Sequence, residues 1–318
     1  MRRFKFSLLC GACTLFFTVS AYAQDINQAI EFNNNGAAAV SQKNWAEAIT
    51  QYNQALTIAL QLEDEEAADI AQSIQDIIPS LHYFLGQELA LDSQIDEAID
   101  QLNKAIETAN LYDDFGTTAA DAKKLIDQIM MKVATDLFSN KEYAQAIEAF
   151  NTLLDADPNN GILYFYIGAA NAELNNENQA IAAYEKAIEL GDKNAAPRLA
   201  NIYLKQAQAA QKDKKWANMN DLAKKALAIA PDNANAVNFV GISAFELKRY
   251  DEAIPALEKT LAANPNAPNK NGTIYRLAQA FEAQNKNSQA CGYYKQLLTD
   301  ANYKQMAEHK IKNVLKCE

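Results

Sequence analysis

The chain has 318 residues and a net charge of −11, and it contains only 10 glycines and seven prolines. So few turn-forming residues argue against a β-sandwich, and the abundant alanine, glutamine, leucine, lysine and glutamate favour helix. Residues 24–127 contain 19 acidic and four basic residues, a net charge of −15, whereas residues 128–318 carry a net charge of +1. Because so acidic a surface repels phosphate backbones, we do not expect nucleic-acid binding.

The first 23 residues have the three parts of a secretory signal peptide. A positive start (RRFK, residues 2–5) precedes an apolar stretch at residues 6–19, and AYA at residues 21–23 supplies the small–x–small cleavage pattern. We therefore expect cleavage after Ala23 and an exported protein, periplasmic or secreted, either free or associated with the envelope. An uncleaved N-terminal anchor is the alternative, and no later stretch is apolar for long enough to cross a membrane.

One sequence motif recurs through the rest of the chain. It contains alanine and isoleucine, followed after two residues by an aromatic residue or leucine. It reads AEAITQYNQAL at 46–56 and DEAIDQLNKAI at 96–106. Its register residues are Ala48, Ala98, Ala146, Ala180, Met219 in a weaker copy, Ala253 and Ala290. Twelve residues before each lies a small residue: Gly36, Gly86, Ala134, Gly168, Ala207, Gly241 and Ala278. This pattern predicts seven helix–turn–helix units that stack on their neighbours.

The first two units are longer than the others. Their register residues are 50 and 48 residues from the next, against 34 to 39 later. The extra sequence is helical, with one long helix expected at residues 65–91, kinked or broken at Pro79, and another at 117–138. We therefore predict acidic repeats with elongated helices at 24–127 and regular repeats at 128–304. The acidic residues either complement helix dipoles and keep the chain soluble, or form a docking face for a basic partner.

The fifth unit departs from the pattern in its second helix. Met219 stands where alanine is expected, and Ala223 where an aromatic residue is expected. Two interpretations are open: a compensating exchange of volumes, or a slightly loosened joint between helices.

A final amphipathic helix is expected near the C-terminus, where residues 303–315 would cap the last repeat within a capping segment at 305–318. Once the signal is removed, the remaining cysteines are Cys291 and Cys317. Since an exported chain meets oxidising conditions, we predict a disulfide between them, which would join the cap to the seventh repeat. The alternative is two unpaired small hydrophobic residues.

The recurring pattern resembles the tetratricopeptide repeat, a 34-residue helix–turn–helix unit with small residues where its two helices meet. The resemblance covers nearly all of the chain after the signal. It implies an all-α fold, a right-handed α-solenoid of about seven repeats, with a concave groove lined by the first helix of each repeat.

The resemblance also places particular residues in that groove. By position these are Tyr83, Phe165, Asn238, Phe245, Tyr275 and Glu282, while Met131 and Phe138 either join them or are buried by the long N-terminal helices. Exposed aromatic residues mixed with amide and carboxylate groups suit capture of a peptide. The carboxylate clamp of chaperone-docking members is absent, since its Lys and Asn positions hold, for example, Phe165 and Ala169.

Catalysis is not expected, because the sequence offers no convergent set of titratable residues. The two histidines, His82 and His309, lie in distant repeats, and His82 has the position of a packing residue. No metal-ligand motif, phosphate-binding loop or nucleophile motif is present, so we expect no metal and no cofactor.

The sequence therefore predicts a scaffold or adaptor that holds a protein or peptide partner in its groove. The alternative is a structural subunit of a cell-envelope assembly, joined through the acidic N-terminal repeats. Neither the identity of the partner nor the oligomeric state can be derived from the residues.

Overall fold

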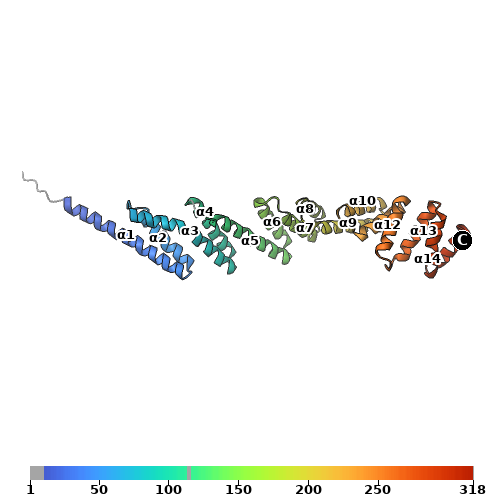
Figure 1. The fold of residues 1–318 in the computed structure, drawn as a ribbon, viewed down its shortest axis with the longest axis horizontal. Coiled ribbons are helices and arrows are strands. Elements are labelled where there is room, and N and C mark those ends of the chain that lie inside the picture. Colours follow the sequence, from blue (N-terminus) through green and yellow to red (C-terminus); the bar gives the residue numbers. More distant parts are fainter. Residues whose placement is uncertain (1–10, 113–115, 318) are drawn as a thin grey trace, which may run out of the picture. The chain divides into compact units, whose positions relative to one another are not determined.

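The computed structural model describes the backbone of residues 11–112 and 116–317, and side chains within those ranges from residue 25 onward. Within this part the chain forms helices joined by short turns and contains no strand. The predicted all-α repeat fold is therefore confirmed (Figure 1). The positive start of the predicted signal peptide lies outside the described residues.

The helices form consecutive pairs, each with a first helix (helix A) and a second helix (helix B) (Figure 1). The A helices are α1 (Gly11–Ser41), α3 (Glu65–Leu91), α5 (Thr118–Ser139), α7 (Gly161–Glu173), α9 (Ala195–Lys212), α11 (Ala234–Glu246) and α13 (Lys270–Ala283). The B helices are α2 (Trp45–Ala59), α4 (Ile95–Leu111), α6 (Tyr143–Ala156), α8 (Glu177–Glu189), α10 (Trp216–Ile229), α12 (Tyr250–Ala263) and α14 (Asn287–Gln296). A 3-10 turn (Leu297–Thr299), α15 (Lys304–His309) and a π-helical turn (Lys310–Val314) follow.

The chain divides inside α5 into two compact units, Met1–Thr135 and Asp136–Glu318. In the first unit, Ile74 lies in a core shared by α1, α2 and α3, and Leu102 in one shared by α3, α4 and α5. In the second unit, Leu199 and Leu277 lie in two cores that extend over helices α7 to α15. Because each helix buries its apolar face against its neighbours, stability is close to a sum over adjacent repeats.

The small residues of the sequence pattern mark the contacts between helix A and helix B. The six register alanines and Met219 are all 0% exposed. A Cβ added to the helix-A glycine would approach the large helix-B residue of the same repeat to 2.8 Å at Gly168 and 2.7 Å at Gly86. Tyr184 and Leu102 are the residues that occupy this space, so only a hydrogen atom fits at the glycine.

The two helices of the fifth repeat pack against each other as those of the other repeats do. Met219 and Ala223 are both 0% exposed, and α9 and α10 share a continuous core. This burial supports the exchange of volumes between the two positions rather than a loosened joint.

Two of the A helices, α3 and α5, are long, as the spacing of the register residues predicts. α3 has 27 residues and α5 has 22, against 13 in α7. α3 runs through Pro79 without a break. A proline inside a helix costs about 3 kcal/mol. Burial of Ile74, Ile78 and Leu81 contributes roughly 1.5–3 kcal/mol for each side chain, which outweighs that cost.

The turn between helix A and helix B has one geometry in all seven described repeats. The second of its three residues has a positive φ, at Lys43, Ser93, Lys141, Asn175, Lys214, Lys248 and Asn285. In the sixth repeat the Lys248 N–H donates to the Phe245 carbonyl at 2.9 Å, and the Arg249 N–H donates to the Ala244 carbonyl at 2.8 Å. These bonds form a Schellman motif, which satisfies the last carbonyls of helix A. Glycine usually occupies this left-handed position, because other residues are strained there.

Replacing Lys248 with glycine should therefore stabilise the second unit. Lys248 has φ 59°, where a Cβ is unfavourable. After the greater entropy of glycine in the unfolded chain is subtracted, we expect a gain of about 0.5–1 kcal/mol in the free energy of unfolding. Chemical denaturation followed by circular dichroism measures it. Lys248→Ala keeps the Cβ and serves as the control, and equal stability of the two variants would contradict this explanation.

The C-terminal cap differs from the single helix predicted at residues 303–315. α15 is short and passes into the wider π-helical turn, in which the Leu315 N–H donates to the Lys310 carbonyl at 2.9 Å. Both ends of this turn are held by the seventh repeat, through Lys310 bound to Glu282 and through Cys317. Cys291 and Cys317 lie at disulfide-bonding distance, with Cα atoms 5.8 Å apart.

Candidate partner-binding cleft

The predicted groove residues are divided between the two units. Tyr83 belongs to the first unit, where its ring lies 5.7 Å from that of Phe84 and its side chain packs against the core of α3, α4 and α5. The other five residues lie in the second unit. Their contacts show which of them remain free to meet a partner.

Phe165 and Asn238 are both half-buried. The Phe165 ring on α7 lies 5.5 Å from Tyr166 and 5.9 Å from Tyr184, and it packs against the core of α8 to α10. The carboxamide oxygen of Asn238 on α11 is shielded from solvent and has no hydrogen-bond partner among the described residues. Because of its contacts with Tyr166 and Tyr184, Phe165 mainly supports the packing of its own repeat. Partner binding by Phe165 or by Asn238 stays a prediction.

Phe245, Tyr275 and Glu282 are held by internal contacts. Phe245 packs edge-on against Tyr250, and the Tyr275 ring lies 5.3 Å from that of Tyr303 in the cap. These rings belong to the packing of the last two repeats, so their contribution to a free groove stays a prediction.

Glu282 has two internal partners. The Tyr294 hydroxyl donates to Glu282 Oε2 at 2.6 Å, and the Lys310 ammonium group donates to Oε1 at 2.6 Å. Burial, followed by the hydrogen bond to Glu282, raises the pKa of Tyr294 well above its usual value. Glu282 therefore fastens the cap to the seventh repeat, and a partner would have to displace Lys310 to reach its carboxylate.

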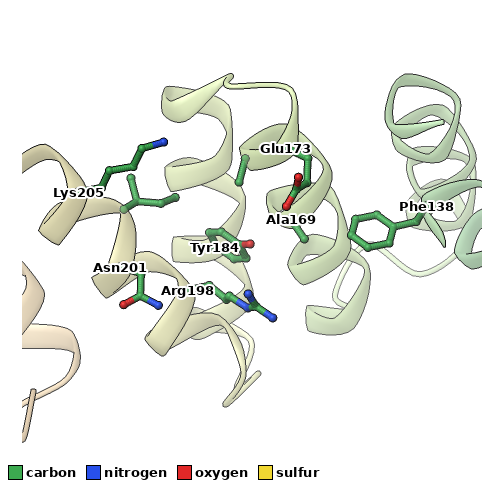
Figure 2. Close-up of a pocket in the computed structure, with 9 residues that line it drawn as sticks. Phe138, Ala169, Glu173, Tyr184, Arg198, Asn201 and Lys205 are labelled. Atoms are coloured by element: carbon green, nitrogen blue, oxygen red, sulfur yellow. The ribbon is translucent and has the colours of Figure 1, made fainter. Parts of the chain in front are cut away.

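A cleft of about 390 Å³ opens in the second unit, beside α7 and α9 (Figure 2). Its volume falls in the range of small-ligand and peptide side-chain pockets. The end of α5, the helices α7 and α9, and Tyr184 of α8 contribute the lining residues: Phe138, Ala169, Ala172, Glu173, Tyr184, Arg198, Asn201, Ile202 and Lys205. Most of these come from A helices, the helices expected to line the groove.

One side of the cleft is polar and basic. Arg198, Asn201 and Lys205 lie at positions i, i+3 and i+7 of α9, a spacing that places them on one helix face. All three are exposed, and none forms an ion pair or hydrogen bond with any residue in the described ranges. Their donors are therefore available to a ligand.

The facing side is small and apolar, with one charge. Ala169 and Ala172 on α7 leave room for a ligand, and Phe138 reaches toward α7 from the end of α5 (Figure 2). The Phe138 ring is fixed by edge contacts with Tyr143, at 5.4 Å, and Tyr166, at 5.7 Å. Glu173 is the exposed acidic residue on this side.

Tyr184 separates the two sides of the cleft. Burial raises its pKa to about 12, with Arg198 acting in the opposite direction. The phenol is therefore neutral at physiological pH and adds no negative charge beside the basic residues of α9.

Sequence reasoning missed the residues of α9. The groove positions taken from the repeat pattern lie three residues before and four residues after the small helix-A residue. In the fifth repeat, where that residue is Ala207, they fall on Leu204, which is buried, and on Gln211. The signal that could have found the α9 residues is the i, i+3, i+7 spacing of Arg198, Asn201 and Lys205, which places these three polar side chains on one face of α9. Phe138, left open between groove and core, lines the cleft.

A second cleft, of about 620 Å³, lies in the first unit and is more open and uncharged. Phe32 and Ile58 provide its apolar surface, while Thr50 and Thr57 donate their hydroxyls to the backbone of their own helix. Asn53 and Gln54 complete the lining with exposed carboxamides, and no charged side chain contributes to it.

The described residues contain no cluster of three or more histidine, cysteine, aspartate and glutamate side chains that could hold a metal ion. His82 is buried, and its Nδ1 forms a hydrogen bond with Gln101 at 2.8 Å, while burial lowers its pKa. No helix in the described ranges combines the length and the apolar character needed to span a membrane.

Paired helices and a cleft formed by A helices define the class of the protein as a helical-repeat protein with a ligand-sized surface site. The family profile of the "cytochrome c-type biogenesis protein H TPR domain" matches residues 112–271, half of the chain, and a further tetratricopeptide-repeat profile matches residues 273–301. The chain belongs to this tetratricopeptide-repeat family.

Curated relatives are similar over shorter stretches. The peroxisomal targeting signal receptor of Kluyveromyces lactis is 31% identical over 32% of this chain and 18% of its own length. Human superkiller complex protein 3 is 40% identical over 26% of this chain and 5% of its own length. Anaphase-promoting complex subunit 6 of Arabidopsis thaliana is 29% identical over 50% of this chain and 29% of its own length. The chain thus spans less than a third of each of these relatives.

Solved structures with the same kind of fold include MamA and YrrB. MamA is 23% identical, with a TM-score of 0.35, over 59% of this chain and 95% of that chain. YrrB, a tetratricopeptide-repeat protein with an unusual peptide-binding site, is 15% identical, with a TM-score of 0.36, over 60% of this chain and 96% of that chain.

Proposed function

We propose that the protein is an exported, non-catalytic scaffold that binds a peptide segment of a protein partner in the cleft beside α7 and α9. The observation that carries the proposal is the set of exposed, unpartnered donors on Arg198, Asn201 and Lys205, facing Phe138 across a cleft of about 390 Å³. Peptide recognition needs contact area for side chains together with hydrogen-bond donors and acceptors for the polar groups, and this cleft supplies both.

Export is part of the proposal. The signal-peptide pattern of residues 1–23 supports it. The Cys291–Cys317 pair also supports it, because disulfides persist in oxidising compartments. N-terminal sequencing of the protein recovered from the producing cells should begin at Gln24, and a chain that keeps its first residues would contradict cleavage.

A photo-reactive amino acid at Asn201 tests partner binding directly. Irradiation in cells or envelope extracts should yield a discrete adduct, because Asn201 is exposed within the cleft. The same group at Gln179, which is exposed on α8 outside the cleft, is the matched control. Excess unmodified protein should compete the Asn201 adduct away. Equal adducts at both positions, or none at Asn201, would remove the basis of the proposal.

A second candidate function is a structural subunit of an envelope assembly, joined through the first unit. Three large apolar side chains there are mostly exposed: Leu60 at 63%, Leu91 at 82% and Leu111 at 71%. Exposed apolar residues in an acidic unit can mark a protein interface. Sedimentation of the triple serine variant distinguishes the candidates, since it should release the chain from an assembly while leaving the Asn201 adduct unchanged.

A further inference from the structure

The basic residues of the cleft are spread along α9 rather than gathered at one point. Arg198 and Lys205 are seven residues apart, which corresponds to about 10 Å along a helix that rises 1.5 Å for each residue. An extended peptide advances about 3.3 Å for each residue. Two acidic side chains three residues apart on such a peptide would match this separation, and two residues apart, about 6.6 Å, they fall within reach of the long arginine and lysine side chains.

We propose that the cleft takes an extended acidic peptide segment, with two carboxylate side chains two or three residues apart and an apolar side chain that packs against Phe138. This inference rests on the proposed function and names the chemistry of the partner. Arg198 and Lys205 each contact one carboxylate, and Asn201 lies between them as a hydrogen-bond donor to the peptide backbone.

The charges of the cleft favour this occupant. The two cations have no ion-pair partner among the residues the structure describes, so binding a carboxylate breaks no internal salt bridge. Their exposure means that each pair adds modest affinity, which salt weakens. The neutral phenol of Tyr184 between the two sides does not oppose the incoming carboxylates.

The side of the cleft that faces α9 supplies apolar contacts for the peptide. Phe138 offers apolar surface on this side, and Ala169 of α7 lies near it (Figure 2). Ala172 of α7 is also small, and Ile202 adds apolar surface from α9. Glu173 contributes one negative charge from α7, whereas Arg198 and Lys205 lie on α9, so carboxylates are favoured along α9.

Fluorescence anisotropy with the full chain tests the inference. The probes are fluorescein-labelled ten-residue peptides, blocked at both ends, that carry phenylalanine and two glutamates separated by one to six positions. Binding should be tightest at a separation of two or three. Replacing both glutamates with glutamine should weaken it about tenfold, as expected for two exposed charge pairs.

Variants of the chain make the test specific. Arg198→Gln with Lys205→Gln should remove the dependence on glutamate spacing, and Glu173→Gln should tighten binding. The matched control, Lys193→Gln with Lys212→Gln, removes the same charge from exposed positions outside the cleft and should bind as the unaltered chain does.

Three results would overturn the inference. They are equal binding at every spacing, stronger binding of neutral peptides with a free terminal carboxylate, or preferential binding of an oligonucleotide of equal charge. If no acidic peptide binds while Asn201 still forms a specific partner adduct, the inference fails and the proposed function stands. If both fail, the cleft is not the recognition site.

Discussion

Loss of the Cys291–Cys317 disulfide should lower the free energy of unfolding of the second unit by about 3–4 kcal/mol. The two cysteines are 26 residues apart in sequence, and the segment between them contains the end of the seventh repeat and most of the cap. Closing a loop of that length removes entropy from the unfolded chain. The remaining attachments of the cap, such as the Lys310–Glu282 ion pair at 2.6 Å, are partly exposed and contribute less.

Denaturant unfolding with and without reductant measures this effect. The unaltered chain should lose stability when dithiothreitol is added, whereas Cys291→Ala with Cys317→Ala should be less stable and insensitive to the reductant. Mass spectrometry without reductant should show the two cysteines joined. Free thiols in the purified protein, or equal stability with and without reductant, would contradict the predicted bond.

Gly168→Ala should destabilise the second unit by about 1–2 kcal/mol, although alanine is the better helix former by roughly 1 kcal/mol. The added Cβ would lie 2.8 Å from the Tyr184 ring, which is only 2% exposed and belongs to the core of the second unit. Overpacking of this kind costs about 1–3 kcal/mol, which exceeds the gain in helix propensity. The substitution therefore tests the contact on which the stacking of each helix pair depends.

Gly292→Ala is the matched control for that substitution. Gly292 lies inside α14, and no atom is found within 4 Å of a Cβ added there. The substitution should stabilise the protein by up to about 1 kcal/mol through helix propensity alone. Thermal and chemical unfolding should separate the two alanine variants by about 2–3 kcal/mol. Similar effects at both positions would show that Gly168 does not mark a close approach of helices.

The fold could be predicted because its determinants repeat. A small helix-A residue, glycine or alanine, and a buried register residue recur in each described repeat, so one copy supports the interpretation of the next. The pairing of Cys317 in the cap with Cys291 could be predicted because an exported chain would meet oxidising conditions, under which disulfides form. The π-helical turn at Lys310 was not predicted, since it depends on two separate attachments to the seventh repeat.

The cleft could be predicted only in part, because several of its lining residues lie at positions that the repeat pattern leaves free. Glu282 occupies a groove position in sequence, but Tyr294 and Lys310 bind its carboxylate. Arg198 and Lys205 lie on α9 at positions that the repeat pattern leaves free, so their importance depends on the helices beside them. Which helices lie beside α9 can be seen only in the three-dimensional structure.

The account depends on the cleft beside α7 and α9 being the surface that meets the partner. Hydroxyl-radical footprinting of the full chain, with and without the partner identified through Asn201, measures this for individual side chains. The account predicts reduced oxidation of Phe138 in the complex and unchanged oxidation of Tyr250, which lies at the start of α12 outside the cleft. Protection of Tyr250 with Phe138 unchanged would contradict it.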